Sequence, residues 1–122
     1  LTLLVGRKKY KIRLAQIDAP EKSQPWGQRS KQSLSELAFA RTVEVEVETE
    51  DRYGRLVATV SAGDLNLNLE QIRRGMAWVY VQYPHSFWMR IEEWQARHDQ
   101  RGLWSDEDPV PPWEWRRARR PR

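Results

Sequence analysis

The 122-residue sequence contains no cysteine, which excludes disulfide bonds, thiolate metal sites and cysteine nucleophiles. It has only two histidines, His85 and His98, and no serine in a Gly-x-Ser-x-Gly setting, which argues against a Ser-His-Asp hydrolase. No apolar run approaches the roughly 18 residues that a membrane-spanning helix needs, so we expect no membrane partner. With 39% hydrophobic and 31% charged residues, the length fits one globular domain with a modest core.

The net charge of +4 is concentrated at the C-terminal end. Residues 1–112 hold 16 of the 21 basic residues and 16 of the 17 acidic ones, whereas residues 113–122 hold five arginines and one glutamate. The first 31 residues contain eight basic side chains but only two acidic ones, Asp18 and Glu21. A basic face and a basic tail are typical of a protein with a polyanionic partner, and the alternative is a solvated surface with a frayed end.

Strand-forming and helix-forming patterns alternate along residues 1–104. We predict helices over 30–41, 67–75 and 85–100, and strands over 1–5, 9–17, 42–49, 55–62 and 76–81. The strand over 42–49 alternates strictly, which predicts a half-buried strand with its glutamates in water. Short strands at this spacing favour a small barrel covered by a helix.

Three finer predictions concern helix ends and helix faces. Ser33 and Glu36 have the spacing of a capping box, for a helix that begins late, and Gly27 marks the earlier boundary. The apolar side of the last helix is predicted to carry the core residues Phe87, Ile91, Trp94 and Ala96. Residues 1–104 form the predicted domain, and the Pro-, Trp- and Arg-rich residues 105–122 are predicted to be an extended tail, pinned by tryptophans such as Trp104, Trp113 or Trp115.

The first stretch whose side chains could carry out a reaction is RLAQIDAPE, residues 13–21. Arg13 lies on the charged side of a strand, and Asp18 and Glu21 follow three residues apart across Pro20. Carboxylate oxygens are the ligands that Ca²⁺ and Mg²⁺ prefer, a second carboxylate can act as general base, and an arginine can bind a phosphate through two donors. The structural alternative is a capping aspartate, a surface glutamate and a salt-bridged arginine.

The second stretch is DRYGR, residues 51–55. Its Asp-x-x-Gly pattern predicts a tight turn that exposes Arg52 and Tyr53, with Arg55 opening the next strand. On neighbouring strands, Arg55 and Arg13 would place two guanidiniums over one phosphate. The alternative is an ordinary hairpin turn.

RLAQIDAPE, followed about 30 residues later by DRYGR, resembles the staphylococcal nuclease (thermonuclease) family. GMAWVY at 75–80, GLW at 102–104 and PPWEWRR at 111–117 extend the similarity along the chain. The resemblance implies an α+β fold that is mainly β: a five-stranded OB-type barrel with about three helices, its first strand truncated here. It also implies a calcium-dependent nuclease acting on DNA and RNA, with loss of the 5′-oxygen and products ending in 3′-phosphate.

The resemblance also implies roles for individual residues. Arg13 and Arg55 match the arginines that bind the scissile phosphate, and Glu21 matches the base that activates water. Ca²⁺ would be held by Asp18 and the backbone carbonyl of Ala19, with Glu21 reaching it through a water. The expected substrate-binding residues are Arg52, Tyr53 and one of Tyr80 and Tyr83.

Family members carry an Asp-Gly-Asp-Thr stretch, including a second calcium-binding aspartate, just before the position of Leu1. We therefore expect this chain to bind calcium weakly and to cleave slowly or not at all. The runner-up function is a non-catalytic nucleic-acid-binding module of the OB type, and a protein-interaction domain using the tryptophan-rich tail is a third. A monomer is the default, and the compartment stays open, with export favoured by the family.

Overall fold

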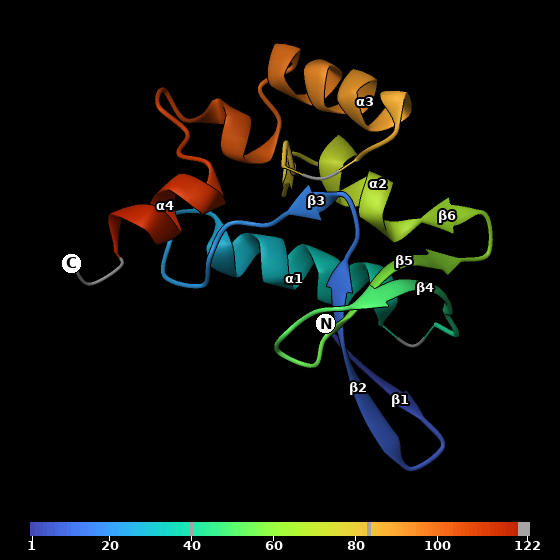
Figure 1. Ribbon diagram of the computed structural model, residues 1–122. Helices are drawn as coiled ribbons and strands as arrows, with labels where there is room; N and C mark the ends of the chain where they lie inside the picture. The colour runs from blue at the N-terminus through green and yellow to red at the C-terminus, as the bar shows by residue number, and fades with distance from the viewer. Residues whose placement is uncertain (40, 83, 120–122) are drawn as a thin grey trace.

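The computed structural model describes residues 1–39, 41–82 and 84–119, which form a mixed α+β fold (Figure 1). Its elements, in chain order, are β1 (Thr2–Val5), β2 (Lys8–Leu14), β3 (Ile17–Asp18), α1 (Gly27–Ala38), β4 (Glu44–Glu50), β5 (Leu56–Ala62), β6 (Leu65–Asn66), α2 (Leu67–Arg73), β7 (Trp78–Val79), α3 (Phe87–His98), the 3₁₀ turn η1 (Gly102–Ser105) and α4 (Pro112–Ala118). None of the helices in these ranges is long and apolar enough to cross a membrane.

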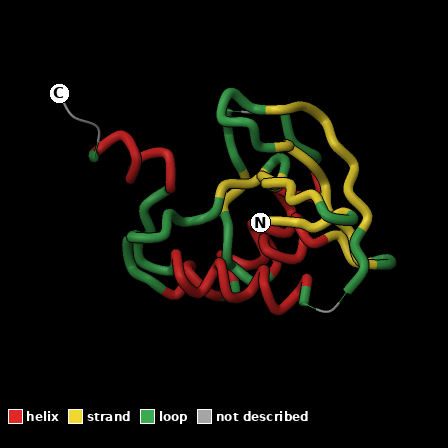
Figure 2. The backbone as a smooth tube through the Cα atoms, turned by 90° about the horizontal axis from the view of Figure 1, so that it is seen from below, coloured by secondary structure: helices red, strands yellow, loops and turns green. Residues whose placement is uncertain are grey.

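A five-stranded sheet forms one side of the molecule, with helices gathered on the other side (Figure 2). The strand order is β1-β2-β5-β4, and β6 pairs with β5. β2 and β5 are parallel, with Arg13 opposite Val57, whereas β1–β2 and β4–β5 are antiparallel hairpins. The alternation in β2 places Ile12 and Leu14 in the core and Arg13 on the opposite face.

The predicted α+β class is confirmed, but the sheet is not closed into a barrel. The register explains why. β1 pairs with residues 8–11 of β2, while β5 pairs with Ile12–Leu14, so the first hairpin projects away from β4 (Figure 1). β1 and β4 are the outer strands of the sheet, and among the described residues they do not pair with each other or with a strand that would connect them.

β4 differs from its prediction in burial. All seven of its residues are exposed, and Val45 and Val47 are 36% and 49% accessible. The alternation of valine and glutamate sets which way each side chain points, but none of the described elements covers the valine face. The prediction of a half-buried strand was therefore wrong.

One buried amide ties the end of β2 to β5. The Asn68 side chain is fully buried at the start of α2 and donates to the carbonyl oxygens of Ala15 and Ala58, each at 3.1 Å. Its own oxygen accepts from the Val60 backbone N–H at 3.0 Å. The Ala58 carbonyl also accepts from the Ala15 N–H at 2.8 Å, so this single side chain adds to the backbone pairing between the end of β2 and β5.

The apolar core lies between the sheet and helices α1, α2 and α3. Its fully buried members include Val60, Leu67 and Ile72. A second cluster joins Trp78, Ala96, Leu103 and Trp104, with Trp26 and Trp113 packed against it.

The predicted core face of α3 was largely wrong. Only Ala96 of the four predicted residues is buried, while Phe87, Ile91 and Trp94 are 74%, 38% and 62% exposed. The helix buries the face of Met89, Glu93 and Ala96 instead. Glu93 can be buried there because it accepts from the Val79 N–H and pairs with Arg97.

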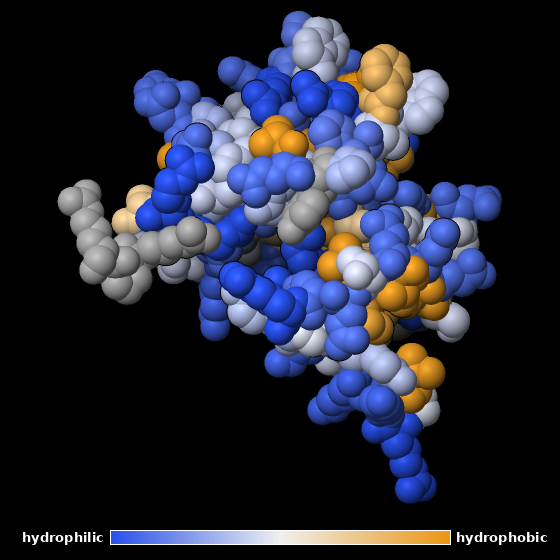
Figure 3. Space-filling model, in the orientation of Figure 1, coloured by the Kyte–Doolittle hydropathy of each residue, from blue (hydrophilic) through white to orange (hydrophobic). Residues whose placement is uncertain are grey.

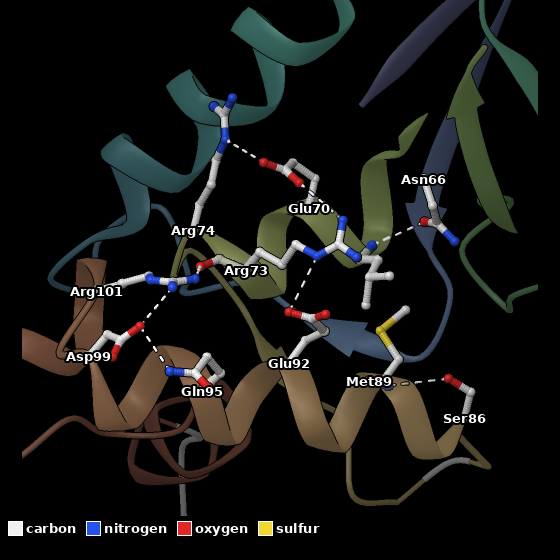
Figure 4. A network of polar contacts seen from close by, with 11 residues as sticks. Asn66, Glu70, Arg73, Arg74, Ser86, Met89, Glu92, Gln95, Asp99 and Arg101 are labelled. Atoms are coloured by element: carbon white, nitrogen blue, oxygen red, sulfur yellow. Dashed lines mark hydrogen bonds and ion pairs between the residues drawn. The ribbon is translucent and has the colours of Figure 1, made fainter. Parts of the chain in front are cut away.

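Ion pairs hold α2 beside α3 (Figure 4). Arg73 bridges Glu70 on its own helix, at 3.6 Å, and Glu92 on α3, at 3.3 Å. The N-caps of both helices are side-chain oxygens, that of Asn66 for α2 and that of Ser86 for α3 (Figure 4). On the face of the molecule seen in Figure 1, most of the surface is hydrophilic and the hydrophobic residues lie in small groups (Figure 3).

One helix begins at the earlier of its two predicted boundaries, and another forms in the segment predicted to be extended. α1 begins at Gly27, so Ser33 lies in its second turn and hydrogen-bonds Gln71 rather than forming a capping box. α4 occupies part of the segment predicted to be extended. Pro112 stands at its first turn, where proline's missing N–H costs no helical hydrogen bond.

We expect Asn68→Ala to lower the free energy of unfolding by about 2–4 kcal/mol, because it leaves buried backbone groups unpaired. Urea denaturation followed by circular dichroism measures this change. Asn66→Ala, which removes a helix cap, is the matched control with an expected loss of about 1 kcal/mol. Equal losses in the two variants would contradict the role given to Asn68.

Candidate functional site

The site begins where β2 leaves the main sheet. The chain turns at Gln16, whose φ is +70°, and Ile17–Asp18 then pair antiparallel with Val79 and Trp78. This short ladder holds Asp18 in the body of the molecule, with only 7% of its surface exposed. A carboxylate at that depth requires a charged or hydrogen-bonding partner.

A compact loop then carries Glu21. Its backbone N–H donates to the Gln24 side chain at 3.0 Å, and its carbonyl accepts from the Gln24 N–H at 2.9 Å. Gly27, the first residue of α1, approaches so closely that a Cβ there would overlap the Glu21 carbonyl. Glycine at this position lets the helix begin directly beneath the loop.

Asp18 and Glu21 converge on one guanidinium, that of Arg116 in α4. Arg116 Nη2 lies 2.6 Å from Asp18 Oδ2, and Nη1 lies 3.2 Å from Asp18 Oδ1 and 2.7 Å from Glu21 Oε1. The two carboxylates predicted to act together are therefore brought together around a single cation. Sequence reasoning treated Arg116 only as part of a basic tail, because 98 residues separate it from Asp18.

Burial dominates the electrostatics of Asp18. It raises the pKa of the carboxyl, and the hydrogen bonds and charge of Arg116, with the charge of Arg13, offset it only in part. The hydrogen bonds to Asp18 and Glu21 raise the pKa of Arg116 above its ordinary value. Asp18 is thus a carboxylate whose ionised form depends on a neighbouring cation.

Arg13 approaches the same place from β2. Its guanidinium lies near the Ile17 carbonyl, at 3.5 Å, and over the Tyr80 ring, 5.2 Å from its centre. Tyr80 is stacked on Trp113 of α4, with 5.5 Å between ring centroids. Arg13, Asp18, Glu21 and Tyr80 therefore share one neighbourhood.

Arg55 lies on the adjacent strand, immediately before β5. The register that sets Arg13 opposite Val57 puts Arg55 on the same face of the sheet as Arg13, two residues along. Its Nε donates to Asp51 Oδ2 at 2.7 Å, so the guanidinium is held within its own turn.

Asp51 organises this turn. It also accepts from the backbone N–H groups of Tyr53 and Arg55, each at 2.9 Å. Desolvation acts to raise the pKa of Asp51, but the hydrogen bonds from Arg55 and Tyr53 together outweigh it and hold that pKa below its ordinary value. The sequence prediction of a tight turn at DRYGR is confirmed by the turn hydrogen bond from Gly54 N–H to Asp51.

The predicted substrate-binding residues differ in position. Arg52 and Tyr53 sit at the exposed tip of the turn and contact each other, with Arg52 Nη2 donating to the Tyr53 hydroxyl at 2.7 Å. The structure sets Tyr80 beside Arg13, whereas Tyr83 lies outside the described residues. The choice between the two tyrosines stays a prediction.

The donor set is small but suits a hard divalent cation. Among the described residues, no three His, Cys, Asp or Glu side chains gather in a metal-binding cluster. Two carboxylates already share one cationic group at this site, and Mg²⁺ or Ca²⁺ can complete a shell on such a pair with water and substrate oxygens. The exposed Ala19 backbone lies between the two carboxylates in sequence.

Comparison with known proteins gives a consistent result. The family described as "Staphylococcal nuclease homologue" matches residues 11–106. An "uncharacterized endonuclease" of Haemophilus influenzae is 45% identical over 116 residues, covering 94% of this chain and 65% of that protein, and so this chain spans less than two thirds of that relative. A protein of the same printed name from Escherichia coli is 44% identical, covering 95% and 76%. A "micrococcal nuclease" of Shigella flexneri is 40% identical, covering 97% and 74%.

We expect Gly27→Ala to lower the free energy of unfolding by roughly 3 kcal/mol or more, because the new methyl group displaces the Glu21 backbone. Gly63→Ala is the matched control. Gly63 has a φ of +59° but open space around it, so the expected loss is about 1 kcal/mol. Thermal and urea unfolding of both variants measure the difference, and a neutral Gly27→Ala would disprove the close approach.

Proposed function

The chain belongs to the staphylococcal nuclease family, and we propose that it is a calcium-dependent nuclease that hydrolyses phosphodiester bonds of DNA and RNA. The observation that carries this proposal is the convergence of Asp18 and Glu21 on one cation beside Arg13. Two carboxylates next to an arginine, one of them buried and the other reached by water, suit a reaction in which water attacks an anionic phosphate. The names of the nuclease relatives support the same reaction class.

In the proposed reaction, Glu21 acts as general base. Its side chain is 39% exposed, compared with 9% for Asp18, so it is the carboxylate of the pair that water reaches. Glu21 takes a proton from the attacking water, the new P–O bond forms in line, and the bond to the 5′-oxygen breaks. The 5′-oxygen leaves with the bonding electrons and takes a proton from solvent water. The products then end in a 3′-phosphate and a 5′-hydroxyl.

Arg13 and Arg55 are proposed to bind the scissile phosphate and the charge that develops on its oxygens. Arg13 lies on β2 and Arg55 lies immediately before the parallel strand β5, on the same face of the sheet, so the β2–β5 pairing sets their backbone positions. The Asp51 carboxylate preorganises Arg55 at the strand end. Arg52 and Tyr53 at the exposed tip would contact the substrate further along.

Calcium would be held by Asp18 and by Glu21, through a water, with the Ala19 carbonyl as a backbone ligand. When bound, the ion supplies positive charge that polarises the phosphate and favours ionisation of water. The β3–β7 ladder keeps the Asp18 carboxylate buried and oriented for this role.

We expect Glu21→Gln to reduce cleavage of single-stranded DNA by about 10²-fold or more, because the amide cannot accept the proton of water. The assay follows release of acid-soluble nucleotides in CaCl₂, with chelator as a blank. Glu36→Gln, at an exposed position of α1, is the matched control and should cleave normally. DNA binding without cleavage by the unmodified chain would favour the nucleic-acid-binding module instead.

Arg13→Lys and Arg55→Lys should each lower kcat by about 10²-fold or more with little change in fold, since lysine keeps the charge but loses the two-donor fork. Arg7→Lys in the β1–β2 turn serves as the control. Single-turnover cleavage separates the chemical step from substrate binding. A variant that changed only KM would contradict a role in the transition state.

A further inference from the structure

The C-terminal helix places a positive charge on the carboxylates that the reaction needs. Arg116 makes a bidentate contact with Asp18 and a third contact with Glu21, all within 3.2 Å. Its side chain is 34% exposed, so the guanidinium is partly withdrawn from water. Charge-assisted contacts of this kind are among the strong polar contacts in proteins.

Other contacts keep α4 and the segment before it against the site. Trp113 stacks on Tyr80 and meets Trp78 edge to face, with centroids 5.7 Å apart in the second pair. The side chain of Gln24, in the loop that carries Glu21, donates to the Val110 carbonyl. Trp26 Nε1 donates to Asp106 Oδ2 at 3.0 Å. The position of Arg116 is therefore set by a docked segment and not by one side chain alone.

A guanidinium and a divalent cation compete for these oxygens. Ca²⁺ binds carboxylate oxygens directly at about 2.3–2.6 Å, while Arg116 already lies on three of the four oxygens of the pair. Two cations at this separation also repel each other. Each cation therefore weakens the binding of the other.

We propose that Arg116 is an internal counter-cation which a divalent metal must displace, so that α4 acts as a strap over the site. This inference rests on the proposed function for the identity of the metal site. In the absence of metal, Arg116 offsets part of the negative charge of Asp18 and Glu21 and keeps α4 docked. Binding of the metal releases Arg116, loosens the Trp113–Tyr80 stack and opens the carboxylates to substrate.

Isothermal titration with CaCl₂ tests the proposal on the full chain. Removing the competing charge in Arg116→Gln should tighten calcium binding by about tenfold. Arg117→Gln, which removes the same charge from an exposed neighbour on α4, should leave the affinity within about twofold. Arg116→Lys keeps the charge but not the fork, and its affinity should fall between those of the unmodified chain and Arg116→Gln.

Tryptophan fluorescence reports on α4 independently of activity. Calcium should change the emission of the unmodified chain as Trp113 leaves Tyr80, and Arg116→Gln should show part of that change before calcium is added. Equal or weaker calcium binding by Arg116→Gln would overturn the strap, even where the unmodified chain cuts DNA with calcium. Tighter binding without any cleavage would support the strap and overturn the nuclease proposal, and no calcium binding by any variant would overturn both.

Discussion

The arrangement of the site depends on the hydrogen bonds of Asn68. Its buried amide joins the residue after β2 to the middle of β5, in a parallel ladder only three residue pairs long. That junction fixes Arg13 relative to the strand that Arg55 opens. It also sets where the chain turns at Gln16 to form the β3–β7 ladder and bury Asp18. Arg13, Arg55 and the acidic pair are therefore positioned relative to the same junction.

The second constraint is charge. Burying Asp18 beside Glu21 is unfavourable unless a cation neutralises them, and the pKa of Asp18 is raised even with Arg116 in contact. The structure meets this demand with a guanidinium from the far end of the chain. The carboxylates that pair with Arg116 of α4 are the same ones that are proposed to bind a metal. The docking of α4 is therefore connected to the proposed chemistry.

The parts of the site that depend on residues close together in the chain could be predicted from the sequence. Asp18, Pro20 and Glu21 lie within four residues, so their proximity follows from chain connectivity, and the Asp51–Gly54 turn follows from its own side chain. Hydrophobic patterns were less reliable where polar groups could be buried. The buried face of α3 includes Glu93, which hydrogen-bonds the backbone of β7, and its aromatic side chains point outward. Such a pairing across the fold leaves no trace in the periodicity of one helix.

The C-terminal segment shows the same limit. Its prolines favoured an extended tail, yet Pro112 begins a helix, and that helix places Arg116 on carboxylates 95 and 98 residues away. No local pattern distinguishes Arg116 from the other arginines near it. Closure of the sheet was equally out of reach, because it depends on how the short β1–β2 register meets the rest of the sheet.

The central claim is that Asp18 and Glu21 form one cation site, shared between Arg116 and a catalytic metal. A crystal structure of the chain grown in CaCl₂ with a short single-stranded DNA tests it most directly. The account predicts calcium between the two carboxylates, Arg116 displaced from them and a phosphate beside Arg13. Calcium bound elsewhere, with Arg116 still paired to Asp18 and Glu21, would contradict it.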